Sequence, residues 1–330
     1  MSRRRVLHLV APALLMSPPA PCLAGEDVGP LVRSLWLVQR FGTTEAIGPE
    51  NDQKLKGTLS KALGKEVTLT APGLRGLMEP STFDRLAGAD GKLDAEELRD
   101  ALAADAPESR KRLNPKVVAH AALLTTSFDM IDEDHAAAGR ELTQWIVKEY
   151  RPGRPLHVTV ICTGNSRRSI LGSTMGNVAA AYYGMPEVRF HSGGTAPSAF
   201  NTRTIASLKE IGVEVEPTGA EAPRGEPKTA NPVYKVRWGG SGMEATEFSK
   251  VYSDAANPQS GFAALMVCGE ADAGCPFVKG AALRVSMPYL DPKIYDDSQF
   301  EALKYAERRD DIGRLMLDVM MQARNRLAPH

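Results

Sequence analysis

The stretch that most constrains the fold runs from Leu156 to Ser169 and reads LHVTVICTGNSRRS. Its first half carries Val158, Val160 and Ile161, the apolar β-branched residues typical of a buried central parallel strand. The turn-forming residues 163–166 then lead directly into an apolar helical run. Such a turn aims backbone N–H groups and a helix N-terminus at one place, and that place attracts a tetrahedral oxyanion. The sequence therefore predicts a strand, an anion-binding loop and a helix in direct succession.

The residue types in this loop favour nucleophilic chemistry. A thiol at a helix N-terminus beside a guanidinium ionises readily, so Cys162 is expected to be a thiolate that can attack phosphorus or arsenic. Arg168 offers a planar fork of donors to two oxygens of the anion, and the Ser169 hydroxyl can donate to the sulfur. A buried cysteine with a surface arginine nearby would explain either residue alone, but not the complete string Cys-Thr-Gly-Asn-Ser-x-Arg-Ser. The remaining loop residues are the expected substrate-binding set: Thr163, Gly164, Asn165, Ser166 and Arg167.

At these residues the chain resembles the low-molecular-weight protein tyrosine phosphatase superfamily, which includes the thioredoxin-coupled arsenate reductases. The resemblance spans residues 156–327, roughly half of the chain. It implies an α/β fold with a flavodoxin-like, doubly wound parallel sheet and the anion loop after its first strand. Further stretches that resemble the superfamily are RFHSGGT at 189–195, the segment 201–212, ALMVCGEADAGCP at 264–276, Asp291-Pro292, and RDDIGRL at 309–315.

Two further cysteines follow a second apolar run at residues 263–267. Cys268 and Cys275 lie seven positions apart, as the second and third cysteines of the reductases do. The resemblance implies a relay in which Cys162 attacks arsenate, Cys268 attacks Cys162 with release of arsenite, and Cys275 attacks Cys268. An external thiol reductant, such as a thioredoxin-like protein, would be the partner, with no bound cofactor. The alternatives are two unrelated loop cysteines or a static disulfide.

Asp291 precedes a proline, and the resemblance implies that it is the general acid that protonates the leaving oxygen. A plain Asp-Pro turn is the alternative. With Cys162, Arg168 and Asp291 alone, the chain would be a phosphatase that hydrolyses phosphomonoesters through a phosphocysteine, and Tyr289 and Tyr295 could line a slot for the phenyl ring. A third hypothesis is a non-catalytic module that holds an oxyanion or a phosphopeptide.

Composition and the N-terminus bear on location. The 330 residues are 43% apolar and 24% charged with zero formal net charge, so no general affinity for nucleic acid or anionic membranes follows. Residues 1–24 combine Arg3-Arg4-Arg5, an apolar stretch and a small-residue end, typical of a signal peptide of possible twin-arginine type. We expect an exported, periplasmic or extracellular protein without a transmembrane segment after cleavage. A cytoplasmic protein with a frayed basic N-terminus is the alternative.

The segment 25–150 has no catalytic signature and is expected to be a mainly helical accessory region before the catalytic domain, residues 151–330. Helical spacing is found at 115–126 and 135–150. Residues 83–98 resemble an EF-hand. The candidate calcium ligands Asp90, Asp94 and Glu97 occupy the fifth, ninth and twelfth loop positions.

The first and third positions of that loop would be Leu86 and Gly88, which supply no carboxylate. A degenerate, calcium-free helix-turn-helix is therefore favoured over a working calcium site. Nearer the C-terminus, the segment between Glu216 and Val251 is longer than the family pattern needs and predicts a hairpin turned at Gly239-Gly240. A long final helix is predicted at 301–327.

Overall fold

The computed structural model describes residues 69–70, 92–93, 106–125, 127–223 and 230–327. The chain divides into two compact units, Met1–Ala106 with Ala328–His330, and Pro107–Leu327. In the first unit, β1 (Leu69–Thr70) pairs antiparallel with β2 (Lys92–Leu93). The expected signal peptide at 1–24, the rest of 25–105 with its expected helices, and the acidic residues Asp90, Asp94 and Glu97 lie outside the described residues.

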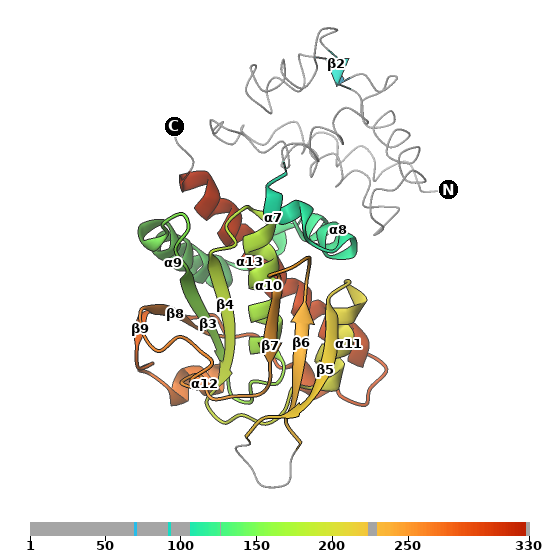
Figure 1. Cartoon of the computed structure of the whole chain (residues 1–330), viewed down its shortest axis with the longest axis vertical. Coiled ribbons are helices and arrows are strands. Elements are labelled where there is room, and N and C mark those ends of the chain that lie inside the picture. Colours follow the sequence, from blue (N-terminus) through green and yellow to red (C-terminus); the bar gives the residue numbers. More distant parts are fainter. Residues whose placement is uncertain (1–68, 71–91, 94–105, 126, 224–229, 328–330) are drawn as a thin grey trace, which may run out of the picture. The chain divides into compact units, whose positions relative to one another are not determined.

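A four-stranded, all-parallel sheet forms the centre of the second unit, which is therefore an α/β structure (Figure 1). Its order is β4 (Val188–Gly194), β3 (Leu156–Cys162), β8 (Phe262–Met266) and β9 (Ala281–Ser286). The two inner strands, β3 and β8, are buried along almost their whole length, as the apolar runs predicted. The sequence did not predict β9.

Helix α10 (Arg168–Tyr182) follows the loop after β3 and packs on β3 and β4. The helix lies close to the sheet because a Cβ at Gly172 would come 2.7 Å from Val160, and one at Gly176 would enter the ring of Phe190. The predicted last helix is α13 (Glu301–Leu327), which packs against α10. None of the helices in the described ranges has the length and apolar content needed to cross a bilayer.

The helices that precede the sheet belong to the same compact unit. They are α7 (Glu108–Lys111), α8 (Pro115–Leu124), η2 (Phe128–Met130) and α9 (Glu133–Glu149). Both α8 and α9 occupy the stretches with helical spacing, and α9 packs on α13 and β9. Asp132 caps α9 by accepting from the amide of His135, and Leu142, Trp145 and Ile146 form its buried face.

A second, antiparallel sheet stands beside the first (Figure 1). It contains β5 (Glu214–Glu221), β6 (Pro232–Arg237) and β7 (Glu244–Glu247). The predicted hairpin is confirmed as β6 and β7, closed by a 3.0 Å bond from the Trp238 amide to the Met243 carbonyl. Three short elements complete the unit: α11 (Thr202–Glu210), α12 (Gly269–Gly274) and η3 (Pro292–Tyr295).

Candidate active site

In the loop between β3 and α10, as far as the structure describes the chain, carbonyl groups are hydrogen-bonded and amide groups are not. The carbonyls of Cys162, Thr163 and Gly164 accept bonds of 2.9 to 3.1 Å from backbone amides of residues 195–198. Within the described part of the chain, the amides of residues 164–167 donate to no carbonyl or side chain. Several uncommitted N–H groups at the start of a helix form a nest for an anion.

Asn165 gives the loop its sharp bend. Its φ of 42° lies in the left-handed region, which asparagine tolerates better than most residues. Its buried side chain donates to Ser169 Oγ at 2.9 Å and accepts from the Lys250 amide at 2.8 Å, so the bend is held from both sides. The strand β4 must end in glycine here, because a Cβ at Gly194 would lie 2.6 Å from the Thr163 carbonyl oxygen and 2.9 Å from the Asn165 nitrogen.

The predicted nucleophile, Cys162, and the predicted hydrogen-bond donor to its sulfur, Ser169, are in contact. Cys162 Sγ lies 3.1 Å from Ser169 Oγ, and the cysteine is only 3% exposed. Because Ser169 Oγ already accepts from Asn165, its hydroxyl hydrogen is free to be directed at the sulfur. This arrangement suits a thiolate acceptor.

Arg168 and Asp291, the expected anion-binding residue and the expected general acid, bind each other in the described structure. Nη2 of Arg168 donates to Oδ2 of Asp291 at 2.6 Å, and Nη1 donates to the Tyr289 carbonyl at 2.8 Å. The Nε of the same guanidinium is buried and meets no hydrogen-bond acceptor within the described ranges. A buried, unsatisfied donor of a cation is costly, and an incoming oxyanion would satisfy it.

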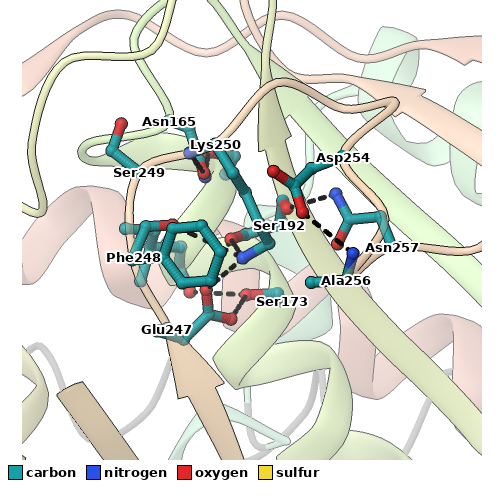
Figure 2. Close-up of polar contacts among 12 residues, drawn as sticks. Asn165, Ser173, Ser192, Glu247, Phe248, Ser249, Lys250, Asp254, Ala256 and Asn257 are labelled. Atoms are coloured by element: carbon teal, nitrogen blue, oxygen red, sulfur yellow. Dashed lines mark hydrogen bonds and ion pairs between the residues drawn. The ribbon is translucent and has the colours of Figure 1, made fainter. Parts of the chain in front are cut away.

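The segment after β7 supports the loop from beneath. Ser249 Oγ donates to the Gly164 carbonyl at 2.8 Å, and the next amide, that of Lys250, donates to Asn165. In Figure 2 these residues and Asn165 lie together. This role of the longer segment was not predicted, because a hairpin pattern does not reveal what the residues after its last strand contact.

A buried ion pair lies in the same segment. Lys250 Nζ is 3.1 Å from Glu247 Oε2, and their side chains are 4% and 5% exposed. Glu247 also accepts from Ser192 Oγ at 2.7 Å and Ser173 Oγ at 3.3 Å, as Figure 2 shows. The carboxylate thus ties β7 to β4 and α10, so the buried charges are compensated by hydrogen bonds.

The two further cysteines cap the two ends of α12. Cys268 is buried, accepts from the Ala271 amide, and its Sγ lies 3.3 Å from Thr163 Oγ1 in the anion loop. Cys275 is half-buried, and its thiol donates to the Phe277 carbonyl at 3.2 Å. At a helical rise of 1.5 Å per residue their Cα atoms are about 10 Å apart, beyond disulfide range. The described cysteines, Cys162, Cys268 and Cys275, are free.

Helix α12 is held in place from β9. Arg284 Nη2 donates to both the carbonyl and the carboxylate of Asp272, the latter at 2.6 Å, and Ser286 Oγ donates to the same carboxylate at 2.8 Å. Arg284 Nε also donates to the Cys275 carbonyl at 3.2 Å. Any movement that brings Cys275 toward Cys268 must therefore break contacts of Arg284.

The rim departs from the expectations in two places. Tyr289 does not line a ring slot: it is 5% exposed and stacks on His135, and burial raises its pKa. The Arg167 guanidinium is engaged by other side chains, donating to the Tyr305 hydroxyl at 2.8 Å and approaching Asp296 at 3.5 Å. Burial and the hydrogen bond to Asp296 raise the pKa of Tyr305 to about 12 despite that cation.

The described residues contain no cluster of three or more His, Cys, Asp or Glu that could hold a metal ion. A scan against models of known protein families finds no match, and a search of curated proteins finds no significantly similar sequence. The contacts of the site bring together seven of the predicted residues: Cys162, Thr163, Asn165, Arg168, Ser169, Cys268 and Asp291.

Proposed function

We propose that this protein is a thiolate-dependent oxyanion enzyme of the low-molecular-weight phosphatase superfamily and acts as an arsenate reductase-like enzyme. The observation that carries the proposal is the loop between β3 and α10, in which Cys162 contacts Ser169, the amides of residues 164–167 are uncommitted and Arg168 begins the helix. The strand order β4-β3-β8-β9, with the second strand outside the first and the loop at a carboxyl end, supports a flavodoxin-like doubly wound fold.

The proposed reduction conserves atoms and electrons in three steps. Cys162 thiolate attacks arsenic and displaces one oxygen, which leaves as water after protonation. Cys268 thiolate then attacks Cys162 sulfur, so that the S–As electron pair passes to arsenic and arsenite leaves. Cys275 thiolate attacks Cys268 sulfur and frees Cys162, and an external dithiol reductant restores the Cys268–Cys275 disulfide to two thiols. The contact between Cys268 and Thr163 supports the second step.

The last step requires α12 to unwind, because the two cysteines cap opposite ends of a six-residue helix. Such a short helix has little stability of its own, and its hold on β9 depends chiefly on Asp272 and Arg284. Unwinding would also carry the disulfide toward the surface, where Cys275 is already partly exposed. A thioredoxin-like reductant is the proposed partner.

A phosphatase acting on phosphotyrosine is the second candidate. It is favoured by Asp291, whose carboxylate reaches Arg168 and so stands beside the anion position. In this mechanism Cys162 forms a phosphocysteine, Asp291 protonates the leaving oxygen, and water then attacks phosphorus. The two candidates share the anion loop and differ in how the adduct breaks down. Export remains part of the proposal and rests on residues 1–24 alone.

The test uses protein from Gly25 onward, fully reduced, with arsenate in one reaction and phenyl phosphate in the other. Thiols are counted before and after exposure, and arsenite is measured. A reductase loses two thiols per arsenite released, and Cys268→Ser abolishes this loss while leaving ester hydrolysis intact. Steady ester hydrolysis without thiol loss on arsenate makes the protein a phosphatase instead. Tight arsenate binding with no turnover of either compound would contradict both enzymatic hypotheses and favour a binding module.

A further inference from the structure

Helix α9 lies before the parallel sheet in the chain, yet its first turn touches the segment that carries Asp291. The ring of His135 stacks on Tyr289 with centroids 4.1 Å apart and planes 9° apart. Its Nε2 lies 3.2 Å from the Pro288 carbonyl oxygen, and its Nδ1 lies 2.5 Å from Asp132 Oδ2. One side chain thus joins the N-terminus of α9 to the Pro288 carbonyl and the Tyr289 ring.

Both hydrogen-bond neighbours of His135 are acceptors, a carboxylate and a carbonyl. The ring satisfies both at once only when each nitrogen carries a hydrogen. The His135 side chain is 18% exposed and that of Asp132 is 62% exposed, so the ring is largely buried while its carboxylate partner faces water. Asp132 faces the ring from its own helix, while Arg308, Asp311 and Arg314 of α13 surround the stacked tyrosine.

Tyr289 connects this contact to the site. Its carbonyl accepts from Arg168 at 2.8 Å, its amide donates to the Val267 carbonyl at 3.1 Å, and Asp291 follows two residues later. A shift of residue 289 therefore moves an acceptor of Arg168 and the carboxylate of Asp291 together. The His135 ring, stacked on Tyr289 and in contact with the Pro288 carbonyl, opposes that shift.

We infer that His135 is a positioning residue for Asp291: it fixes the segment 288–291 so that the carboxylate can serve the leaving oxygen. The inference rests on the proposed function for its chemistry, but the contact itself can be tested without turnover. His135 touches no reacting atom and acts through Tyr289.

The test compares His135→Phe with the parent protein. Phenylalanine keeps an aromatic ring for stacking and removes both hydrogen bonds. His120→Phe is the matched control, because His120 also joins a preceding helix to the C-terminal part of the unit, through Asp310 at 2.8 Å, and lies on α8. Two aryl phosphates are used: phenyl phosphate, whose basic leaving group needs an acid, and 2,4-dinitrophenyl phosphate, whose leaving group does not.

A positioned acid contributes roughly 10²- to 10⁴-fold in rate. We expect His135→Phe to lower kcat/KM for phenyl phosphate about tenfold, since the acid is misplaced and not removed. The rate with the dinitrophenyl ester should change less than about twofold. The control, His120→Phe, should leave the rates with both esters unchanged. Equal losses on both esters would overturn the positioning role, because they would indicate damage to the nucleophile or the fold.

Hydrogen exchange of the peptide containing residues 288–296 gives the second readout. Loss of the hydrogen bonds of His135 should speed exchange of this peptide in His135→Phe, and exchange should be unchanged in His120→Phe. Unchanged exchange in His135→Phe would overturn the inference whatever the kinetics. If the parent protein turns over neither ester nor arsenate, the proposed function fails, and the exchange comparison alone decides whether His135 fixes the segment.

Discussion

The carboxylate of Asp291 accepts a 2.6 Å hydrogen bond from the guanidinium of Arg168. The proposed acid and the proposed anion-binding cation are therefore partners before any substrate arrives. An entering oxyanion must compete with Asp291 for Arg168 and is repelled by the same carboxylate. Binding and leaving-group protonation are thus coupled through one ion pair.

Replacing the acid separates these two effects. Asp291→Asn should bind phosphate or arsenate about tenfold more tightly, because the competing charge is gone, while ester hydrolysis falls roughly 10²-fold or more. Calorimetric titration with phosphate and initial-rate kinetics measure the two changes. Asp296→Asn is the control, since Asp296 contacts Arg167, Arg203 and Tyr305 instead. Weaker phosphate binding by Asp291→Asn would contradict the competition.

Ser169 should govern the reactivity of the nucleophile. Ser169→Ala removes the hydroxyl 3.1 Å from Cys162 Sγ and leaves the Asn165 amide without its acceptor. We expect alkylation of Cys162 by iodoacetamide to slow about tenfold at neutral pH, as expected for one lost hydrogen bond to a charged group. Ser173→Ala, one turn along the same helix, tests for a general effect on α10. Equal rates for parent and Ser169→Ala would refute the assignment.

The hold on α12 should slow disulfide formation. Asp272→Asn weakens the bonds from Arg284 and Ser286, so α12 unwinds more readily and Cys275 reaches Cys268 sooner. We expect the Cys268–Cys275 disulfide to form severalfold faster under a mild oxidant, followed by mass spectrometry of alkylated peptides. Asp254→Asn, in the loop before β8, serves as a control. Slower closure in Asp272→Asn would indicate that the intact helix promotes the exchange.

The buried pair beneath the loop should matter more for stability than a surface pair nearby. Lys250→Met leaves Glu247 without its cation and should destabilise the fold by about 3 to 5 kcal/mol in urea unfolding. Adding Glu247→Gln should recover much of that loss. Arg237→Met, which breaks partly exposed pairs with Glu214 and Glu244, should change stability by about 1 kcal/mol or less. Similar losses for Lys250→Met and Arg237→Met would show that burial does not make the Lys250–Glu247 pair more important for stability than a surface pair.

Acid should destabilise the protein through His191. Burial, followed by the neighbouring charges of His157, Lys250 and Arg189, lowers the pKa of His191 from 6.5 to about 4. Between these values the unfolded chain binds a proton that the folded chain does not, so stability falls as the pH drops from 6.5 toward 4, by roughly 3 kcal/mol.

His191→Gln should therefore flatten the decline in unfolding free energy between pH 6.5 and 4.5. Urea titrations at several pH values measure it, with the pH 7.5 value as each variant's reference. An unchanged decline in the variant would assign the acid sensitivity to other groups, such as the neighbouring His157, whose pKa is also lowered by burial.

Much of the architecture follows from local sequence signals. The run before Cys162 predicted β3, the spacing at 301–327 predicted α13, and Gly239-Gly240 predicted the hairpin turn. Strand β9 was missed because AALRVS mixes apolar and polar residues, as expected of an edge strand buried on one side. Strand β5 was missed because it is almost wholly exposed and contains a proline and a glycine.

The residues that carry the proposed chemistry were easier to predict than the residues that hold them in place. Cys162, Arg168 and Ser169 lie in one short string, so their proximity is fixed by the turn that contains them. Ser249, Lys250 and His135 act through contacts that no spacing encodes, because they depend on how distant segments meet. The burial of Tyr289 was likewise unpredictable, since an aromatic beside Asp291 fits a rim as well as a core.

The supports of the anion loop have a consequence for the order of folding. The bond from the Lys250 amide to Asn165 joins residues 85 positions apart, and the contact between Thr163 and Cys268 joins residues 105 apart. Contacts that close such long stretches of chain form slowly. We therefore expect the nucleophile to acquire these surroundings late in folding, after residues 214–250 have docked. A chain that crossed into an oxidising compartment before that point would expose its thiols to indiscriminate pairing, whereas one that crossed already folded would arrive with Cys162 and Cys268 shielded.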